Sequence, residues 1–228
     1  MPPLIEIFAV NMLAVVGVFL FGWSALTLVL LYWLENLIVG AFNVVKIVMS
    51  GISSGRSGTL ASLFLAPFFV VHYGMFCFVH GLFIVALFGG GSGMASNEGF
   101  TLSGLAGTVA ARVQGDRAMA WGVAMLAAFH LYLFARYWVA ARRWQVSDPL
   151  TQMFAPYSRI LVVHLTIMIA GIPVMLLGQP MLAVLCLALL KTAMETGRAK
   201  LFDTAAQSPR LALETRRRLK ALDDHAWH

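Results

Sequence analysis

The sequence predicts an all-α, polytopic membrane protein with six transmembrane helices, and three observations support this fold class. Of its 228 residues, 60% are hydrophobic and 11% are charged, whereas soluble domains average about 25% charged residues. The apolar stretches reach about 20 residues, the length that a helix needs to cross a hydrocarbon core of ~30 Å. A segment in lipid must satisfy its own backbone hydrogen bonds, so each stretch is expected to be a helix.

Six such stretches follow one another along the chain. Short polar or glycine-containing sequences separate them, including FGWS between the first two and GQP between the last two. The predicted spans cover residues 4–21, 23–48, 60–88, 121–139, 160–178 and 181–201. Residues 1–203 are therefore expected to form one six-helix domain, followed by a basic amphipathic cytoplasmic tail at 204–228.

Basic residues orient this domain, because cytoplasmic loops of membrane proteins carry an excess of lysine and arginine. With the N-terminus inside, the cytoplasmic regions carry the basic tail together with Lys46, Arg56, Arg136, Arg142, Arg143 and Arg159. The external side carries Arg112 and Arg117, which Glu98 and Asp116 offset. Both termini are expected in the cytoplasm. Topology also accounts for the formal charge of +6, so nucleic acid is not expected as a partner.

The segments between the spans carry little chemistry. The N-terminal MPPLIEIF lacks a basic region, so the first span is expected to remain as an anchor. GISSG at 51–55 matches G-x-S-x-G by letter, but it follows a membrane helix and is interpreted as a linker loop. The external 89–116 connection begins as a glycine-rich loop, and its Thr101–Val113 part could form a short interfacial helix. A plain surface loop is favoured there over a lid above an outward cavity.

The ionisable residues inside the spans are the functional candidates, because charge is costly in a membrane. Both cysteines lie in apolar runs, which favours neither a disulfide framework nor a metal motif. The ionisable set comprises Glu35, His72, His80, His130, His164, Lys191 and Glu195. Four of the six histidines of the chain are therefore within spans, which is more than packing requires.

Depth along each helix indicates which of these groups can meet. At a rise of ~1.5 Å per residue, three lie within about 3 Å of the middle of their helices, namely Glu35, His72 and His130. His164 and Glu195 lie about 7 and 6 Å toward the cytoplasm. His80 is the outlier, about 12 Å outward of His72. The first five groups could converge in the middle and inner half of the bundle.

Imidazole combined with carboxylate is typical of zinc, or of non-haem iron or manganese. The nitrogen ligands are predicted to be His72, His130 and His164, with Glu35 and Glu195 as carboxylate ligands or as the general base, and with His80 as a further ligand or substrate contact. Tyr32, Asn36 and Tyr73 are placed to hydrogen-bond the outer atoms of such ligands. A metal would lower the pKa of its bound water and so supply a nucleophile. The favoured function is a membrane-embedded enzyme using one or two divalent metal ions, hydrolytic rather than oxidative, acting on a lipid or other apolar substrate.

Other interpretations stay open. The chain has no HExxH motif, and a lone intramembrane histidine is more often a packing residue than a ligand. Glu35 could form an ion pair with Lys191, and Lys191 could also neutralise Glu195 at i, i+4. A transporter or proton relay would use the same residues without metal. One b-type haem between His72 and His130 is a further alternative, although haem would not explain the glutamates. A homo-oligomer is compatible with all of these.

The segment FGWSALTLVLLYWLENLIVGAFNVVKI, followed by HYGMFCFVHG, resembles a family of bacterial multi-pass membrane proteins of unknown function. The resemblance rests on a YW-x-EN signature, here Tyr32, Trp33, Glu35 and Asn36, with His72 and His80 on the next helix. It is strongest over about the first ninety residues. The resemblance implies a compact six-helix membrane protein and brings no activity, so the metal site is inferred from this sequence alone.

Overall fold

The computed structural model describes residues 24–88 and 101–157 together with Ile160 and His164, and the regular elements within these residues are all helical. Three of these helices are long and apolar enough to cross a membrane, which makes the chain a membrane protein by length and composition. The predicted spans 4–21 and 181–201 and the tail lie outside the described residues, as does the rest of 160–178.

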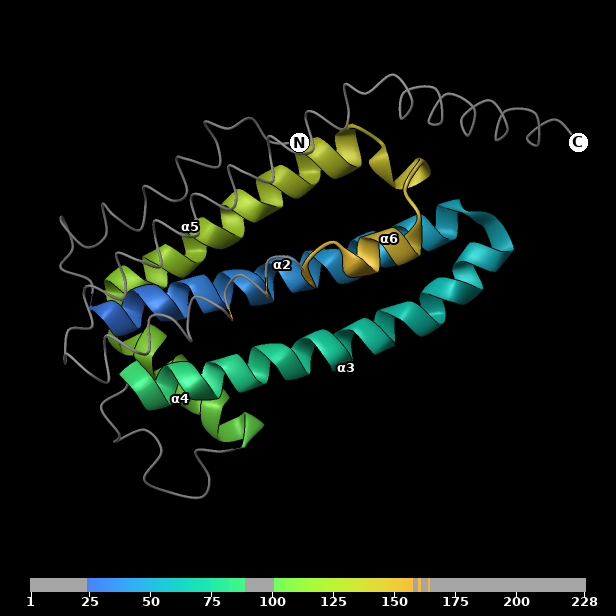
Figure 1. Ribbon diagram of the computed structural model, residues 1–228. Coiled ribbons are helices and arrows are strands. Elements are labelled where there is room, and N and C mark those ends of the chain that lie inside the picture. Colours follow the sequence, from blue (N-terminus) through green and yellow to red (C-terminus); the bar gives the residue numbers. More distant parts are fainter. Residues whose placement is uncertain (1–23, 89–100, 158–159, 161–163, 165–228) are drawn as a thin grey trace, which may run out of the picture.

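Helix α2 (Ala25–Ser53) is central, and Figure 1 shows it between α3 (Gly55–Phe88) and α5 (Arg117–Phe134). The Ser24 hydroxyl caps α2 by accepting a hydrogen bond from the backbone N–H of Thr27 at 3.1 Å. Because Ser54 alone separates α2 from α3, the two helices form an antiparallel pair. The predicted spans 23–48 and 60–88 are confirmed as helices.

The prediction of a linker loop at 51–55 is wrong, because its first three residues belong to α2 and its last residue belongs to α3. Gly51 to Ser53 complete α2, and Gly55 begins α3 with φ at 76°, a left-handed conformation that glycine adopts without steric cost. The Ser54 hydroxyl donates to the carbonyl of Ser50 at 2.8 Å, and the Thr59 hydroxyl donates to the carbonyl of Gly55 at 2.9 Å. The polar composition of this segment therefore does not indicate a loop, because its hydroxyl groups donate hydrogen bonds to the helix backbone.

Small residues let α2 and α3 approach closely. A Cβ atom added at Gly51 would lie 2.3 Å from the Cβ of Ser62 and 2.7 Å from the carbonyl oxygen of Gly58. A Cβ atom added at Gly81 would lie 2.8 Å from the indole of Trp33. These distances are shorter than van der Waals contact, so glycine is required at both ends of the crossing.

Two hydrogen bonds fix the register of α2 against α3. The indole N–H of Trp33 donates to the carbonyl of Cys77 at 2.7 Å. The hydroxyl of Tyr73 donates to the carbonyl of Asn36 at 3.1 Å. Along the bundle axis, Glu35 consequently lies at the level of about residue 75 of α3, between the two histidines of that helix.

The core of the bundle has two apolar clusters, and buried polar residues of α2 lie between them. The cluster near the start of α2 joins residues such as Leu28 and Leu30 to Ile84 of α3 and Met119 of α5. The cluster near the end of α2 joins Ile47, Phe69, Tyr73, Cys77 and Met153. Between them α2 buries the side chains of Glu35, Asn36 and Asn43.

Helix α4 (Leu102–Gly115) lies beside the end of α3 in Figure 1. The Thr101 hydroxyl caps it by accepting from the N–H of Gly104 at 3.1 Å. Leu105 and Val109, one helical turn apart, are buried in the first apolar cluster. The short helix considered for this segment is therefore present, and the plain surface loop that was favoured is wrong, because an i, i+4 apolar pair packs on the bundle.

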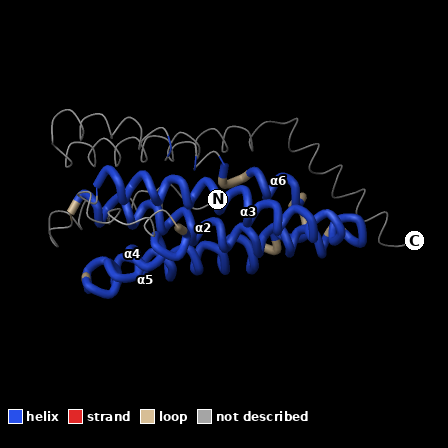
Figure 2. Tube along the Cα trace, turned by 90° about the horizontal axis from the view of Figure 1, so that it is seen from below, coloured by secondary structure: helices blue, strands red, loops and turns tan. Residues whose placement is uncertain are grey.

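The chain continues from α5 through a π-helical segment, η3 (Ala135–Ala140), a 3-10 turn, η4 (Arg143–Gln145), and α6 (Pro149–Phe154). The span predicted at 121–139 is thus confirmed as helical. Figures 1 and 2 show α2, α3 and α5 side by side, and α6 packs on both α2 and α3. The side-chain amide of Asn43 donates to the carbonyl of Gln152 at 2.9 Å and holds α6 in place.

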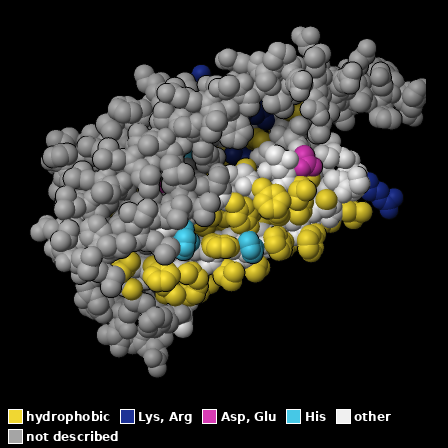
Figure 3. Space-filling model, viewed as in Figure 1, with side chains coloured by type: hydrophobic (Ala, Val, Ile, Leu, Met, Phe, Trp, Pro, Cys, Tyr) yellow, Lys and Arg dark blue, Asp and Glu magenta, His cyan; other side chains and the backbone are white. Residues whose placement is uncertain are grey.

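The outer face of α3 is strongly apolar. Figure 3 shows hydrophobic side chains along this helix, with histidine among them. Leu63, Phe64 and Val71 are 67%, 71% and 73% exposed. A continuous apolar face on a helix of this length fits contact with lipid.

We expect Gly51→Ala to lower the stability of the bundle by about 1–3 kcal/mol, because the added methyl group meets the backbone of Gly58 and α2 must move away from α3. Gly74→Ala is the matched control, since nothing lies within 4 Å of an added Cβ at this α3 position. The control should leave stability unchanged or raise it slightly. Thermal unfolding of detergent-purified protein measures both, and equal melting temperatures for the two variants would contradict the close crossing.

Candidate functional site

The described residues bring Glu35 and His130 together, as their common depth predicted. The carboxylate Oε1 of Glu35 lies 3.1 Å from Nε2 of His130, across the contact of α2 with α5. Glu35 is 2% exposed. Because a carboxylate only accepts hydrogen bonds, Nε2 of His130 bears the shared hydrogen when Glu35 is ionised. The other ring nitrogen, Nδ1, has no hydrogen-bond partner among the described residues.

The polar residues beside Glu35 bond to the helix backbone. The side-chain amide of Asn36 donates to the carbonyl of Tyr32 at 3.0 Å. The hydroxyl of Tyr73 in turn donates to the carbonyl of Asn36. These bonds tie α2 to itself and to α3 at the level of Glu35. That Tyr32, Asn36 and Tyr73 hydrogen-bond the outer atoms of metal ligands stays a prediction.

A second pair joins His80 of α3 to His164. Nε2 of His80 lies 2.8 Å from Nδ1 of His164, and the rings meet edge to face at 79°. Nδ1 of His80 lies 2.5 Å from the carbonyl oxygen of Phe76. A carbonyl oxygen only accepts, so Nδ1 of His80 bears a hydrogen, and in the neutral ring Nε2 accepts from His164.

A third pair joins His72 to Tyr157, whose hydroxyl oxygen lies 2.7 Å from Nδ1 of the imidazole. Burial raises the pKa of Tyr157, so its phenol stays protonated, and the tautomer of His72 decides which of the two groups donates. The ring of His72 also stacks on Phe68, with centroids 5.2 Å apart. His72 is thus engaged on the side of α3 that faces Tyr157.

The contact between His80 and His164 corrects the depth prediction. That prediction centred each span on the middle of the membrane and so put these two histidines on opposite sides of it. Their direct contact requires a common level on α3, about 8 Å from the level of Glu35 at 1.5 Å per residue. The offset of one helix against its neighbour depends on packing between them, which the hydropathy of a single span does not contain.

Within the described residues, four of the predicted ligands therefore form two pairs, Glu35 with His130 and His80 with His164, and His72 bonds Tyr157 instead. No group of three or more histidine, cysteine, aspartate or glutamate side chains in this part of the chain is arranged to hold a metal ion. Glu195 and Lys191, a candidate ligand and the alternative partner of Glu35, lie outside it. Cys77 is a buried free thiol on α3.

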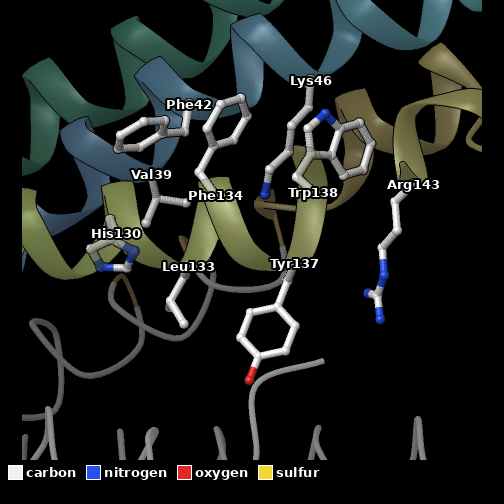
Figure 4. Close-up of a pocket in the computed structure, with 9 residues that line it drawn as sticks. All are labelled: Val39, Phe42, Lys46, His130, Leu133, Phe134, Tyr137, Trp138 and Arg143. Atoms are coloured by element: carbon white, nitrogen blue, oxygen red, sulfur yellow. The ribbon is translucent and has the colours of Figure 1, made fainter. Parts of the chain in front are cut away.

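A cavity of about 200 Å³ lies beside His130, between α2 and the segment formed by α5, η3 and η4. Figure 4 shows the residues that line it, which are Val39, Phe42, Lys46, His130, Leu133, Phe134, Tyr137, Trp138 and Arg143. The ammonium group of Lys46 lies 5.5 Å from the centre of the Trp138 ring, a cation–π contact.

Sequence reasoning missed this cavity because it interpreted Lys46 and Arg143 as markers of the cytoplasmic side. A signal was present in the spacing. Val39, Phe42 and Lys46 are separated by three and four residues and so share one face of α2. On α5 and η3, His130, Phe134 and Trp138 share a face by the same rule.

No curated protein and no solved structure matches the sequence. A family model does match, and it covers residues 1–220 of the 228. Its description is a family of unknown function, which agrees with the kind of family that the YW-x-EN segment resembles. The chain belongs to this family of unknown function, DUF6498.

Proposed function

We propose that the chain is a multi-pass protein of a bacterial inner membrane, with six spans and both termini in the cytoplasm. The distribution of charge over the described bundle supports this topology. The hydroxyl of Ser53 donates to the carbonyl of Trp144 at 2.5 Å, so the end of α2 and the start of η4 lie together. At that end gather Lys46, Arg56, Arg142 and Arg143, whereas Arg112 and Arg117 lie near Asp116 at the other end.

Within this frame we propose a membrane-embedded enzyme that hydrolyses a lipid or another apolar substrate, with Glu35 and His130 as its reacting pair. The observation that carries the proposal is the position of His130. Its imidazole contacts the buried carboxylate of Glu35 and also lines a cavity. An ionisable pair inside a span is costly to keep, and its contact with a cavity gives it access to a substrate.

The pair supports general acid–base chemistry. Glu35 accepts a hydrogen bond from Nε2–H of His130 and stabilises the imidazolium that forms when Nδ1 takes a proton from water. The hydroxide adds to the acyl carbon or the phosphorus of an ester, and the ester bond to the leaving oxygen then breaks. Nδ1 returns its proton to that oxygen, so the imidazole is regenerated. Each step uses only water and the ester.

A divalent metal, zinc or iron, belongs to the same proposal if Glu195 completes the site. Glu35 and His130 are suitable ligands by chemistry, as are His80 and His164, but each pair needs at least one further ligand. A bound metal ion would supply a water molecule of lowered pKa. Glu35 and His130 would then hold the ion as a carboxylate and an imidazole ligand.

Hydrolysis should depend on both members of the pair. We expect His130→Ala and Glu35→Gln to slow release of fatty acid or headgroup from bacterial lipid in mixed micelles by about 10²-fold or more. Glu98→Gln, in the predicted external loop, is the carboxylate control and should retain wild-type rates. Mass spectrometry of the products measures the rates. Equal rates for His130→Ala and the wild type would rule out the pair as the reacting centre.

Metal content tests the metal-dependent form separately. Elemental analysis of tag-free protein purified without chelators should find zinc or iron near one or two ions per chain. We expect Glu35→Gln and Glu195→Gln to lose this metal and Glu98→Gln to keep it, because a carboxylate ligand binds through its charge. If the protein contains no metal even after attempted reconstitution, and still hydrolyses its substrate, the metal-dependent form is ruled out and the metal-free mechanism remains.

A proton relay is the second candidate, and the contact of His80 with His164 favours it. Two imidazoles in a direct hydrogen bond can pass a proton from ring to ring. In proteoliposomes that contain a pH-sensitive dye, a relay should carry protons down a gradient, and His164→Leu should reduce the flux at least tenfold. His225→Leu, in the tail, is the control. A wild-type protein without proton flux would exclude this candidate.

A further inference from the structure

The cavity beside His130 carries positive charge that the described residues do not neutralise. Lys46 and Arg143 both line it. The described carboxylates are those of Glu35, Asp116 and Asp148, and none lies within 4.0 Å of either cation. Glu35 pairs with His130, while the two aspartates cap α5 and α6. Two like charges at one cavity repel each other, and an anion between them removes that cost.

The side-chain hydrogen-bond donors of Lys46 and Arg143 also lack an acceptor among the described side chains. The contact of Lys46 with the Trp138 ring uses the charge of the ammonium group but provides no acceptor. Within the described part of the chain, neither Lys46 nor Arg143 donates a hydrogen bond to a side chain. Figure 4 shows Lys46 reaching from α2 and Arg143 from the segment that follows η3, so both sides of the cavity contribute cations.

Much of the remaining wall is apolar and includes the neighbours of His130. Val39 and Phe42 of α2 line it together with Leu133 and Phe134 of α5. The rings of Phe42 and Phe134 stack with centroids 5.1 Å apart. A cationic end joined to an apolar wall matches an amphiphile with an anionic group better than it matches a fully polar ion.

The depth of Lys46 matches the boundary of the membrane. Lys46 follows Glu35 by eleven residues in the same helix, which is about 16 Å along the axis. Half of a hydrocarbon core is about 15 Å thick. With Glu35 near the middle of the membrane, Lys46 therefore lies at the level where the phosphate groups of lipids begin.

From these observations we infer that the cavity binds a phosphate group, carried by a phospholipid, through Lys46 and Arg143. Lysine and arginine are suitable donors to the several acceptor oxygens of a phosphate. A volume of about 200 Å³ holds a headgroup but not acyl chains, which would remain in the bilayer. The inference deepens the proposed function and rests on it for one point only, that the bound phospholipid is the substrate that reaches His130.

Native mass spectrometry of delipidated, detergent-purified protein tests the binding. The probes are phosphatidylglycerol, diacylglycerol with the same acyl chains, and inorganic phosphate. We expect one phosphatidylglycerol per chain and no retained diacylglycerol. Lys46→Gln and Arg143→Gln should each weaken phosphatidylglycerol binding about tenfold or more. Arg56→Gln is the control, an exposed arginine at the same end of the bundle that does not line the cavity.

The outcomes separate the two sources of phosphate and the two proposals. Displacement of the lipid by millimolar inorganic phosphate would support a phosphate site that also takes the free ion. Equal retention of diacylglycerol, or undiminished binding in both cavity variants, would overturn the inference. Arg143 is exposed, so its variant remains informative if Lys46→Gln fails to fold. Phosphatidylglycerol that binds without being hydrolysed would overturn its role as the substrate and leave this binding site standing.

Discussion

Glu35 is a buried carboxylate on α2, the helix that both other long helices of the described bundle contact. An ionised carboxylate removed from water costs several kcal/mol unless a partner compensates it. His130 is such a partner, and because it lies on α5, it positions that helix at the level of Glu35. The stacked rings of Phe42 and Phe134 and the contact of Lys46 with Trp138 then continue the same seam along α2. The cavity lies along this seam from His130 to Trp138, so its position follows from the pairing of the buried charge.

The intramembrane histidines have a structural role whichever function holds. Within the described residues each has a polar partner distant in sequence, with His130 bonding Glu35, His80 bonding His164, and His72 bonding Tyr157. Hydrogen bonds between helices stabilise a bundle in lipid, where apolar surfaces alone provide little discrimination. Loss of one histidine can therefore loosen the bundle as well as remove a reacting group. For this reason a conservative substitution of Glu35 is a more informative test of function than the removal of a histidine side chain.

The sequence predicted the three long helices of the described bundle and a common depth for Glu35 and His130, but not the cavity, and the difference has a physical basis. Span length and the central position of a residue in its span are local properties, so Glu35 and His130 could be placed at one depth. The pairing of His80 with His164 depends on how far one helix slides along another, which no single span encodes. The short helix at Leu102–Gly115 and the helical ends around Ser54 depend on tertiary contacts and on hydroxyls that bond the backbone. Lys46 was assigned to topology because a lysine near the end of a span usually has no other role.

The π-helical segment at Ala135–Ala140 has a consequence for variation in chain length. A π-helical turn contains one more residue than an α-helical turn, and each residue of a helix turns the chain by about 100°. Because the wide turn already accommodates the extra residue, deletion of one residue within this segment would restore α-helical pairing and leave the residues that follow at nearly the same angle relative to α2. Arg143 would therefore keep its place at the cavity, and the change would be confined to the turn that carries Trp138. Homologous chains with one residue fewer here would thus share the helices, the buried carboxylate and the cation from η4, and differ in the aromatic contact of Lys46.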